Sequence, residues 1–238
     1  MEKDTADLQT KALEVHGRLC RLYGCPIRFF SGKDPISELV SALLSHRTRN
    51  AESARAYRRL RKIFPTWEAV AAAPVGAVKE AISAATWPEQ KAPRLQEVLR
   101  QVQARTGGSL ALGFLADLPV PEARAWLEGL PGVGPKTSSA VLLFSQLRRP
   151  ALPVDSHHHR VAQRLGLLPA GMGPGPAHHW LARLVPPDWD AQQVYDHHEA
   201  FMLHGQRCCY YTQPACHRCP VLELCPYGQE RVLPRPPS

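Results

Sequence analysis

The stretch Leu130-Pro-Gly-Val-Gly-Pro-Lys-Thr137 separates two segments with helical periodicity. Apolar residues recur at helical spacing in residues 123–130 before the glycines and in residues 137–144 after them. Glycines permit positive φ, so a tight turn between two helices is predicted. Such a turn directs backbone N–H groups and a helix start toward one point, which suits a phosphate. For so short a motif, an ordinary helix–helix turn is about equally well supported.

Two ionisable residues lie near this turn. Pro135 fits the first position of the second helix, where its missing N–H costs nothing, and Lys136 then projects from the helix start. Further along, Asp155 directly precedes a helical segment that begins at Ser156, so it suits an N-cap. Capping and catalysis are compatible roles for one carboxylate. A lysine and an aspartate around a phosphate-binding hairpin indicate chemistry on DNA.

Residues 130–167 closely resemble the endonuclease III family of helix-hairpin-helix DNA glycosylases, in which the hairpin is followed by a lysine and later by Val-Asp. The resemblance places Lys136 and Asp155 on the two catalytic positions of that family. It also implies that the hairpin binds DNA through a set of four residues: Gly132, Val133, Gly134 and Thr137.

The helical patterns predict an all-α fold, because runs of alternating, strand-like residues are absent. The resemblance implies two helical lobes with a DNA-binding cleft between them. One would be a six-helix lobe with the hairpin, residues 34–149. The other would be discontinuous, residues 1–33 and 150–238, and would hold a C-terminal cluster loop. Residues 169–176, rich in proline and glycine, predict a connecting loop.

Four cysteines near the C-terminus have the spacing C-x6-C-x2-C-x5-C: Cys209, Cys216, Cys219 and Cys225. Four thiolates suit either an iron–sulfur cluster or zinc, and the spacing alone does not decide between them. The resemblance implies a [4Fe-4S] cluster, which the endonuclease III family carries on this spacing. Cys208 could replace its neighbour as a ligand, but Cys209 preserves the family's spacing. Cys20 lies in an apolar helical pattern, so we expect a small core residue there.

The chain departs from the family at two positions where family members insert side chains into DNA. Arg47, in Leu43-Leu-Ser-His-Arg-Thr-Arg-Asn50, aligns with the glutamine that fills the gap left by a flipped base. Trp87 aligns with an aliphatic wedge residue. An arginine can pair with the orphaned base, and an indole can stack on a base. Both residues are therefore expected to bind DNA, although a core position is the alternative for Trp87.

Charge agrees with a nucleic-acid partner without proving one. The chain has 29 Lys and Arg residues against 21 Asp and Glu residues, a formal charge of +8, which favours binding to polyanions. A basic helix face in residues 55–62 is better explained by solvent exposure. No apolar stretch is long enough to cross a membrane, and no export signal is visible. We expect an intracellular, cytoplasmic monomer that does not bind membranes.

Lys136 distinguishes the chain from adenine-specific and thymine-mismatch relatives, which usually lack this lysine. The resemblance therefore implies a bifunctional base-excision-repair enzyme, a DNA N-glycosylase with AP lyase activity. Its partner would be double-stranded DNA with damaged bases or abasic sites, and its lesions oxidised pyrimidines such as thymine glycol. Two alternatives stay open. One is a monofunctional glycosylase for another lesion, and the other is a DNA-binding damage sensor with weak or no catalysis.

Overall fold

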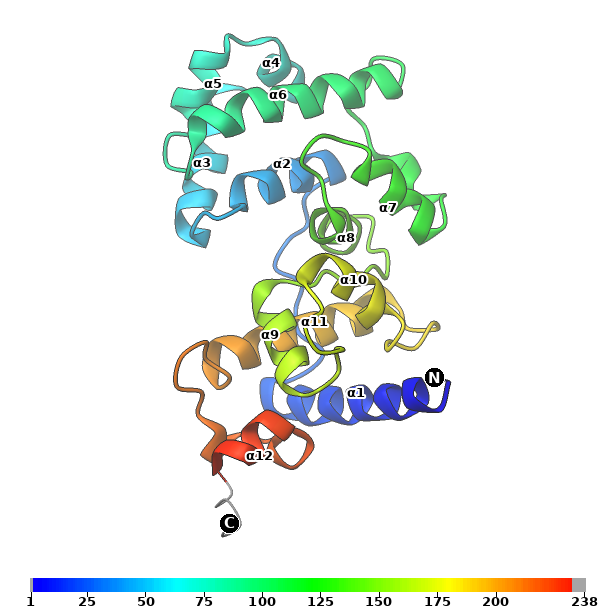
Figure 1. Ribbon diagram of the computed structural model, residues 1–238. Helices are drawn as coiled ribbons and strands as arrows, with labels where there is room; N and C mark the ends of the chain where they lie inside the picture. The colour runs from blue at the N-terminus through cyan, green and yellow to red at the C-terminus, as the bar shows by residue number, and fades with distance from the viewer. Residues whose placement is uncertain (1, 233–238) are drawn as a thin grey trace. The chain divides into compact units, whose positions relative to one another are not determined.

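The computed structural model describes residues 2–232, and every regular element in this range is helical (Figure 1). This confirms the all-α fold expected from the sequence. The chain divides into two compact units, one of residues 31–149 and one of residues 1–30 with 150–238. Among the described helices, none combines the length and the apolar character that crossing a bilayer requires.

The unit of residues 31–149, all of which the structure describes, holds seven α-helices: α2 (Pro35–Ser45), α3 (Asn50–Ile63), α4 (Trp67–Ala72), α5 (Val75–Ala81), α6 (Pro88–Arg105), α7 (Val120–Glu128) and α8 (Pro135–Phe144). The expected number was six, and two of the seven, α4 and α5, have only six and seven residues. Helix α2 packs against α3, α6 and α8, while α6 also packs against α4 and α5 (Figure 1). Fully buried leucines such as Leu39, Leu99 and Leu142 form its core.

The other unit joins the start of the chain to its last third. Its α-helices are α1 (Glu2–Tyr23), α9 (Ser156–Arg164), α10 (Pro174–Ala182), α11 (Ala191–Arg207) and α12 (Pro226–Val232). Helix α11 packs against both α1 and α9. Leu19 of α1 and Phe201 of α11 are fully buried. Because α11 contacts α1, residues far apart in the sequence share one hydrophobic core.

Two sequence expectations for this unit are wrong. Cys20 is not a free core thiol, because it forms a disulfide with Cys25, with their Cα atoms 5.0 Å apart. The chain turns back after α1 through Gly24, whose φ is +81°, and this turn brings the two cysteines together. Residues 169–176 are not wholly a loop, because α10 begins at Pro174. Proline is tolerated there since the first turn of a helix has no intrahelical acceptor for its N–H.

Candidate functional site

The turn between α7 and α8 uses the left-handed backbone at one glycine only. Gly132 has φ +77°, whereas Gly134 is extended, with φ −107° and ψ −177°, and it is the N-cap residue of α8. The N–H of Val133 donates to the carbonyl of Leu130 at 3.1 Å, which closes the turn. Pro135 occupies the first turn of α8, as the sequence predicts. The helix–turn–helix is therefore tight, and it starts α8 directly after the turn.

The space around Gly132 is also narrow. A Cβ atom at this position would lie 2.8 Å from Cδ of Arg94, whose side chain reaches the turn from α6. The N–H groups of Gly132 and Gly134 donate no hydrogen bond to another described residue. Backbone N–H groups at a helix start beside a guanidinium are the donors that a phosphate needs.

Two hairpin residues predicted to bind DNA are buried. The exposed fraction is 5% for Val133 and 2% for Thr137. The Thr137 hydroxyl also pairs with Nε2 of His46 at 2.9 Å. Both side chains support the turn from inside, and DNA binding at these two positions stays a prediction.

His46 lies at the C-cap of α2 among positive charges. Burial, with smaller contributions from the positive charges of Lys136, Lys91 and Arg94, lowers the pKa of His46 to about 4. The imidazole is therefore neutral at neutral pH, where it pairs with Thr137. These basic side chains make this side of the unit attractive to an anion.

Arg47 and Trp87 lie next to each other. The guanidinium carbon of Arg47 is 5.8 Å from the centre of the Trp87 ring. Arg47 is exposed and Trp87 is 45% exposed, which excludes the alternative that Trp87 is a core residue. Both have positive φ, 50° and 54°, although neither is glycine. Such strained residues are found preferentially at functional sites.

Asp155 belongs to the unit of residues 1–30 and 150–238, where it caps α9. Its Oδ1 accepts from the N–H of His158 at 2.7 Å, so the expected N-cap is present. Glu199 of α11 is a second carboxyl in this region and is only 8% exposed. Burial, with a smaller contribution from the charge of Asp155, raises the pKa of Glu199 to about 7. At neutral pH, Asp155 thus has a carboxyl close by that retains its proton about half of the time.

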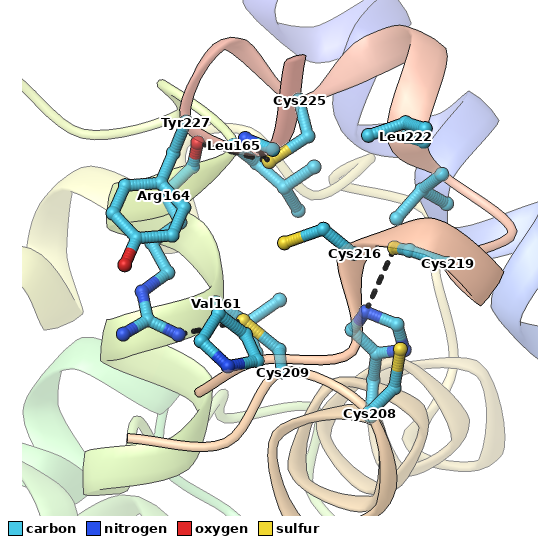
Figure 2. A pocket seen from close by; sticks show the side chains of 14 residues that line it. Val161, Arg164, Leu165, Cys208, Cys209, Cys216, Cys219, Leu222, Cys225 and Tyr227 are labelled. Atoms are coloured by element: carbon cyan, nitrogen blue, oxygen red, sulfur yellow. Dashed lines mark hydrogen bonds between the residues drawn. The ribbon is translucent and has the colours of Figure 1, made fainter. Parts of the chain in front are cut away.

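The predicted ligand cysteines surround one pocket (Figure 2). The close-up shows four sulfurs directed toward a common space, those of Cys209, Cys216, Cys219 and Cys225. Apolar side chains from α9, including Val161 and Leu165, and Leu222 complete the lining. This arrangement of four thiols suits a metal centre of either kind predicted from the spacing.

Hydrogen-bond donors approach the same sulfurs. Nη1 of Arg164 donates to Sγ of Cys209 at 3.3 Å, and the N–H of Gly228 donates to Sγ of Cys225 at 3.3 Å. Donors of this kind stabilise thiolate ligands. Burial raises the pKa of the Cys216 and Cys225 thiols, so a positively charged metal centre must supply the charge that holds them as thiolates. The residues therefore fit a thiolate-bound metal group.

Cys208 lies to one side of this space, near Cys219 (Figure 2). Its thiol donates to the carbonyl of Ala215, with sulfur and oxygen 3.6 Å apart. Nε2 of His204 lies 3.5 Å from Sγ of Cys219, and the ligand atoms of His204, Cys208 and Cys219 lie within 4.8 Å of one another. The other four sulfurs share the common space and Cys208 lies beside it, which favours Cys209 over Cys208 as a ligand.

Sequence reasoning missed four residues of these sites: His46, Lys91, Arg94 and Glu199. Each acts through contacts that no motif spacing encodes, such as Arg94 against Gly132. Nothing in the sequence connects the start of α6 to the end of α2.

Comparison with known proteins agrees with these features. The family model of the HhH-GPD superfamily base excision DNA repair protein matches residues 40–187. Endonuclease III of Thermotoga maritima is 30% identical over 199 residues, which cover 83% of this chain and 85% of that protein. Endonuclease III of Escherichia coli K12 is 29% identical over 222 residues, 93% of this chain and 98% of that protein. An Arabidopsis thaliana protein with a DNA glycosylase designation is 30% identical over 197 residues, and the chain spans 65% of its length.

Solved structures share the fold. A trapped covalent intermediate of endonuclease III with DNA aligns with a TM-score of 0.78 and 23% identity, over 94% of this chain and 98% of that chain. A thermostable thymine-DNA glycosylase aligns with a TM-score of 0.76 and 22% identity, over 93% of this chain and 98% of that chain. The TM-scores of these two structures show that the fold is shared. The family is shown by the family model and by the sequence relatives above.

Proposed function

The chain belongs to the HhH-GPD superfamily of base excision DNA repair proteins and is an endonuclease III-like DNA glycosylase, and from this premise we propose that it is bifunctional. It would excise oxidised pyrimidines of the thymine glycol type from duplex DNA and then cut the strand as an AP lyase. One observation carries the proposal: Lys136 is in the first turn of α8, directly behind the hairpin turn at Gly132. A glycosylase that only hydrolyses the glycosidic bond does not need an amine there.

DNA binding would begin at the hairpin. The N–H groups of Gly132 and Gly134, with Arg94, would hold a phosphate and set the register without selecting a sequence. A base inside a duplex hides its glycosidic bond, so the damaged nucleotide must be flipped out. Arg47 would fill the gap and Trp87 would stack on a neighbouring base.

Lys136 would then act as the nucleophile. Its neutral amine attacks C1′ of the sugar, the bond from C1′ to the base breaks, and the departing base takes the electron pair and a proton. Opening of the sugar ring leaves a Schiff base between Lys136 and C1′. Loss of a proton from C2′ then expels the 3′ phosphate by β-elimination, which cuts the strand. Asp155 would stabilise the positive charge that develops on the sugar.

We further propose that Cys209, Cys216, Cys219 and Cys225 hold a [4Fe-4S] cluster. When bound, the cluster would serve as a cross-link that fixes the C-terminal segment. Arg160 and Arg164 of α9 attach the cysteine loop to their helix through the carbonyls of Cys209, at 3.1 Å, and Tyr210, at 2.6 Å. The same helix is capped by Asp155 at its other end. The cluster would therefore support the position of Asp155 through α9.

Covalent trapping tests the proposed chemistry. The protein is mixed with duplexes containing thymine glycol or an abasic site in the presence of borohydride, which reduces a Schiff base to a stable link. The variant Lys136→Ala is tested beside it, with Lys79→Ala of α5 as a control for the loss of one exposed positive charge. We expect adducts with both duplexes for the wild type and Lys79→Ala, and none for Lys136→Ala.

The other outcomes separate the alternatives. An adduct with the abasic duplex alone would leave a lyase and contradict the thymine glycol assignment. Base release without any adduct would indicate a monofunctional glycosylase, and DNA binding without base release or cutting would indicate a damage sensor. Metal analysis of the anaerobically purified protein tests the cluster, since zinc in place of iron would contradict it. The intracellular, monomeric state remains part of the proposal, and sedimentation analysis tests the monomer.

A further inference from the structure

Lys91 lies in the first turn of α6, and its ammonium group has three acceptors. Nζ donates to the carbonyl of Leu44 at 2.8 Å, to the carbonyl of His46 at 2.7 Å and to Oγ1 of Thr48 at 2.7 Å. An ammonium has three hydrogens, so all of them are used. The two carbonyls come from the C-terminal end of α2, where backbone acceptors lack partners within the helix. Lys91 thus completes the hydrogen bonding at the end of α2.

Thr48 extends this link to the segment before α6. Its hydroxyl accepts from the N–H of Thr86 at 3.1 Å as well as from Lys91, and it donates to the carbonyl of His46 at 3.3 Å. A hydroxyl has one donor and two acceptor sites, so this one has no unused capacity. Thr48 is only 9% exposed. The half-buried Lys91 and the buried Thr48 form a brace between the end of α2 and the start of α6.

The braced residues flank the exposed pair. Arg47 lies between His46 and Thr48, and Trp87 directly follows Thr86. These neighbouring residues are fixed by hydrogen bonds, whereas the side chains of Arg47 and Trp87 are exposed. The guanidinium carbon of Arg47 lies 5.8 Å from the centre of the Trp87 ring. A non-glycine residue with positive φ is strained, so it persists only where surrounding contacts impose it. The brace supplies such contacts at the neighbours of both residues, His46, Thr48 and Thr86.

We propose that Lys91 and Thr48 are positioning residues that hold Arg47 and Trp87 as one preformed pair for entry into the duplex. The inference rests on the proposed function, because it assigns how this chain opens DNA. Preformation lowers the cost of binding, since the two loops are ordered on folding rather than at the encounter with DNA. Gap filling by Arg47 and stacking by Trp87 would then occur in a single step.

The variants follow from the geometry. Thr48→Val removes the hydroxyl and keeps the shape of the side chain, while Thr48→Ser keeps the hydroxyl and serves as the conservative rescue. Lys91→Met removes the ammonium and keeps the stem. Lys79→Met controls for the loss of a positive charge at an exposed position. If Lys91→Met fails to fold, Thr48→Val carries the test alone.

Three measurements distinguish positioning from a general structural role. They are the fluorescence rise of 2-aminopurine opposite the lesion, base release from a paired lesion and from the same lesion in an unpaired bubble, and affinity for undamaged duplex. We expect Thr48→Val and Lys91→Met to lower the fluorescence rise and base release from the paired lesion by about tenfold or more, as a displaced functional group does. Base release from the bubble and affinity for undamaged duplex should stay close to the wild type. Thr48→Ser and Lys79→Met should match the wild type throughout.

A second arm asks whether the brace acts through the exposed pair. In a background of Arg47→Ala with Trp87→Ala, Thr48→Val should have no further effect, because the side chains it positions are already gone. Wild-type behaviour of Thr48→Val on the paired lesion would overturn the inference. Equal losses on the paired and bubble lesions, or an additive loss in the double-variant background, would overturn it as well. Failure of the proposed function would look different, because the wild type itself would neither release base nor form an adduct. In that case the 2-aminopurine fluorescence and the affinity for duplex would still test the brace.

Discussion

In residues 31–149, every hydrogen of the Lys91 ammonium has a protein acceptor. In residues 150–238, by contrast, burial raises the pKa of the half-buried Cys216 thiol and of the buried Cys225 thiol. The ammonium of Lys91 thus finds all its acceptors within the protein. The four thiols converge, but they would need a bound metal to be held as thiolates. The difference teaches that the contacts of Lys91 form by folding alone, while the proposed charged state of the thiols would depend on a cofactor.

The largest expected effect comes from removing a metal ligand. Cys219→Ser should abolish the visible absorbance of the cluster and lower the free energy of unfolding by several kcal/mol, because metal binding contributes on the order of 10 kcal/mol to small metal-dependent folds. Cys208→Ser is the matched control, since Cys208 lies to one side of the pocket, and it should keep the colour (Figure 2). Absorbance, iron content and denaturant unfolding provide the measurement. Loss of colour in Cys208→Ser but not in Cys209→Ser would exchange the two assignments.

A smaller effect is expected within the hairpin. Gly132→Ala should lower the free energy of unfolding by about 1–2 kcal/mol, because φ is +77° and the new Cβ would meet Arg94. It should also weaken DNA binding by displacing the phosphate donors. Gly134→Ala is the matched control, since its backbone is extended and a Cβ there has nothing within 4 Å. Urea unfolding and binding to undamaged duplex measure both; equal effects of the two substitutions would contradict the assigned role of Gly132.

Asp155 allows stability and chemistry to be separated. Asparagine caps helices as well as aspartate does, so Asp155→Asn should keep the stability, while Asp155→Ala should lose about 1 kcal/mol with the hydrogen bond to His158. Base release should fall by about 10²–10³ in both, as expected when a charge-stabilising group is removed. Thermal unfolding and single-turnover base release test this pair. Full activity of Asp155→Asn would remove the carboxylate from the mechanism.

The smallest effects should appear in the pH dependence, with opposite signs in the two regions. The pKa of Glu199 is raised to about 7, so the folded state keeps this proton longer than the unfolded state, and stability falls as pH rises from about 4.5 to 7. The pKa of His46 is lowered to about 4, so the unfolded state takes up this proton first, and stability falls as pH drops from about 6.5 to 4.

Two neutral substitutions isolate these contributions. The stability of Glu199→Gln relative to the wild type should increase as pH rises through its window, and that of His46→Gln should increase as pH falls through the other. Denaturant unfolding at a series of pH values measures both differences. If the stability difference from the wild type changed with pH in the same direction for both variants, the predicted opposite signs would be wrong.

The sequence predicted the elements that carry these sites better than the contacts between them. The hairpin, the Asp155 cap and the convergence of four cysteines follow from local rules of turns, caps and ligand spacing. The brace of Lys91 and Thr48 does not, because its acceptors are carbonyls whose positions depend on how α2 ends against α6. The burial of Thr137 was missed for the same reason, since its partner His46 is remote in the sequence. The disulfide of Cys20 with Cys25 depends on the turn at Gly24, which helical periodicity does not register.

The packing of α1 against α11 sets an order for events during synthesis. Helix α1 is made before residues 31–149, whereas α11, against which it packs, is made after them. That segment can complete its own core while α1 waits for its partner. The candidate cysteine ligands also follow α11 in the chain, so the pocket that they line forms only after the helices of both halves of this unit have been made.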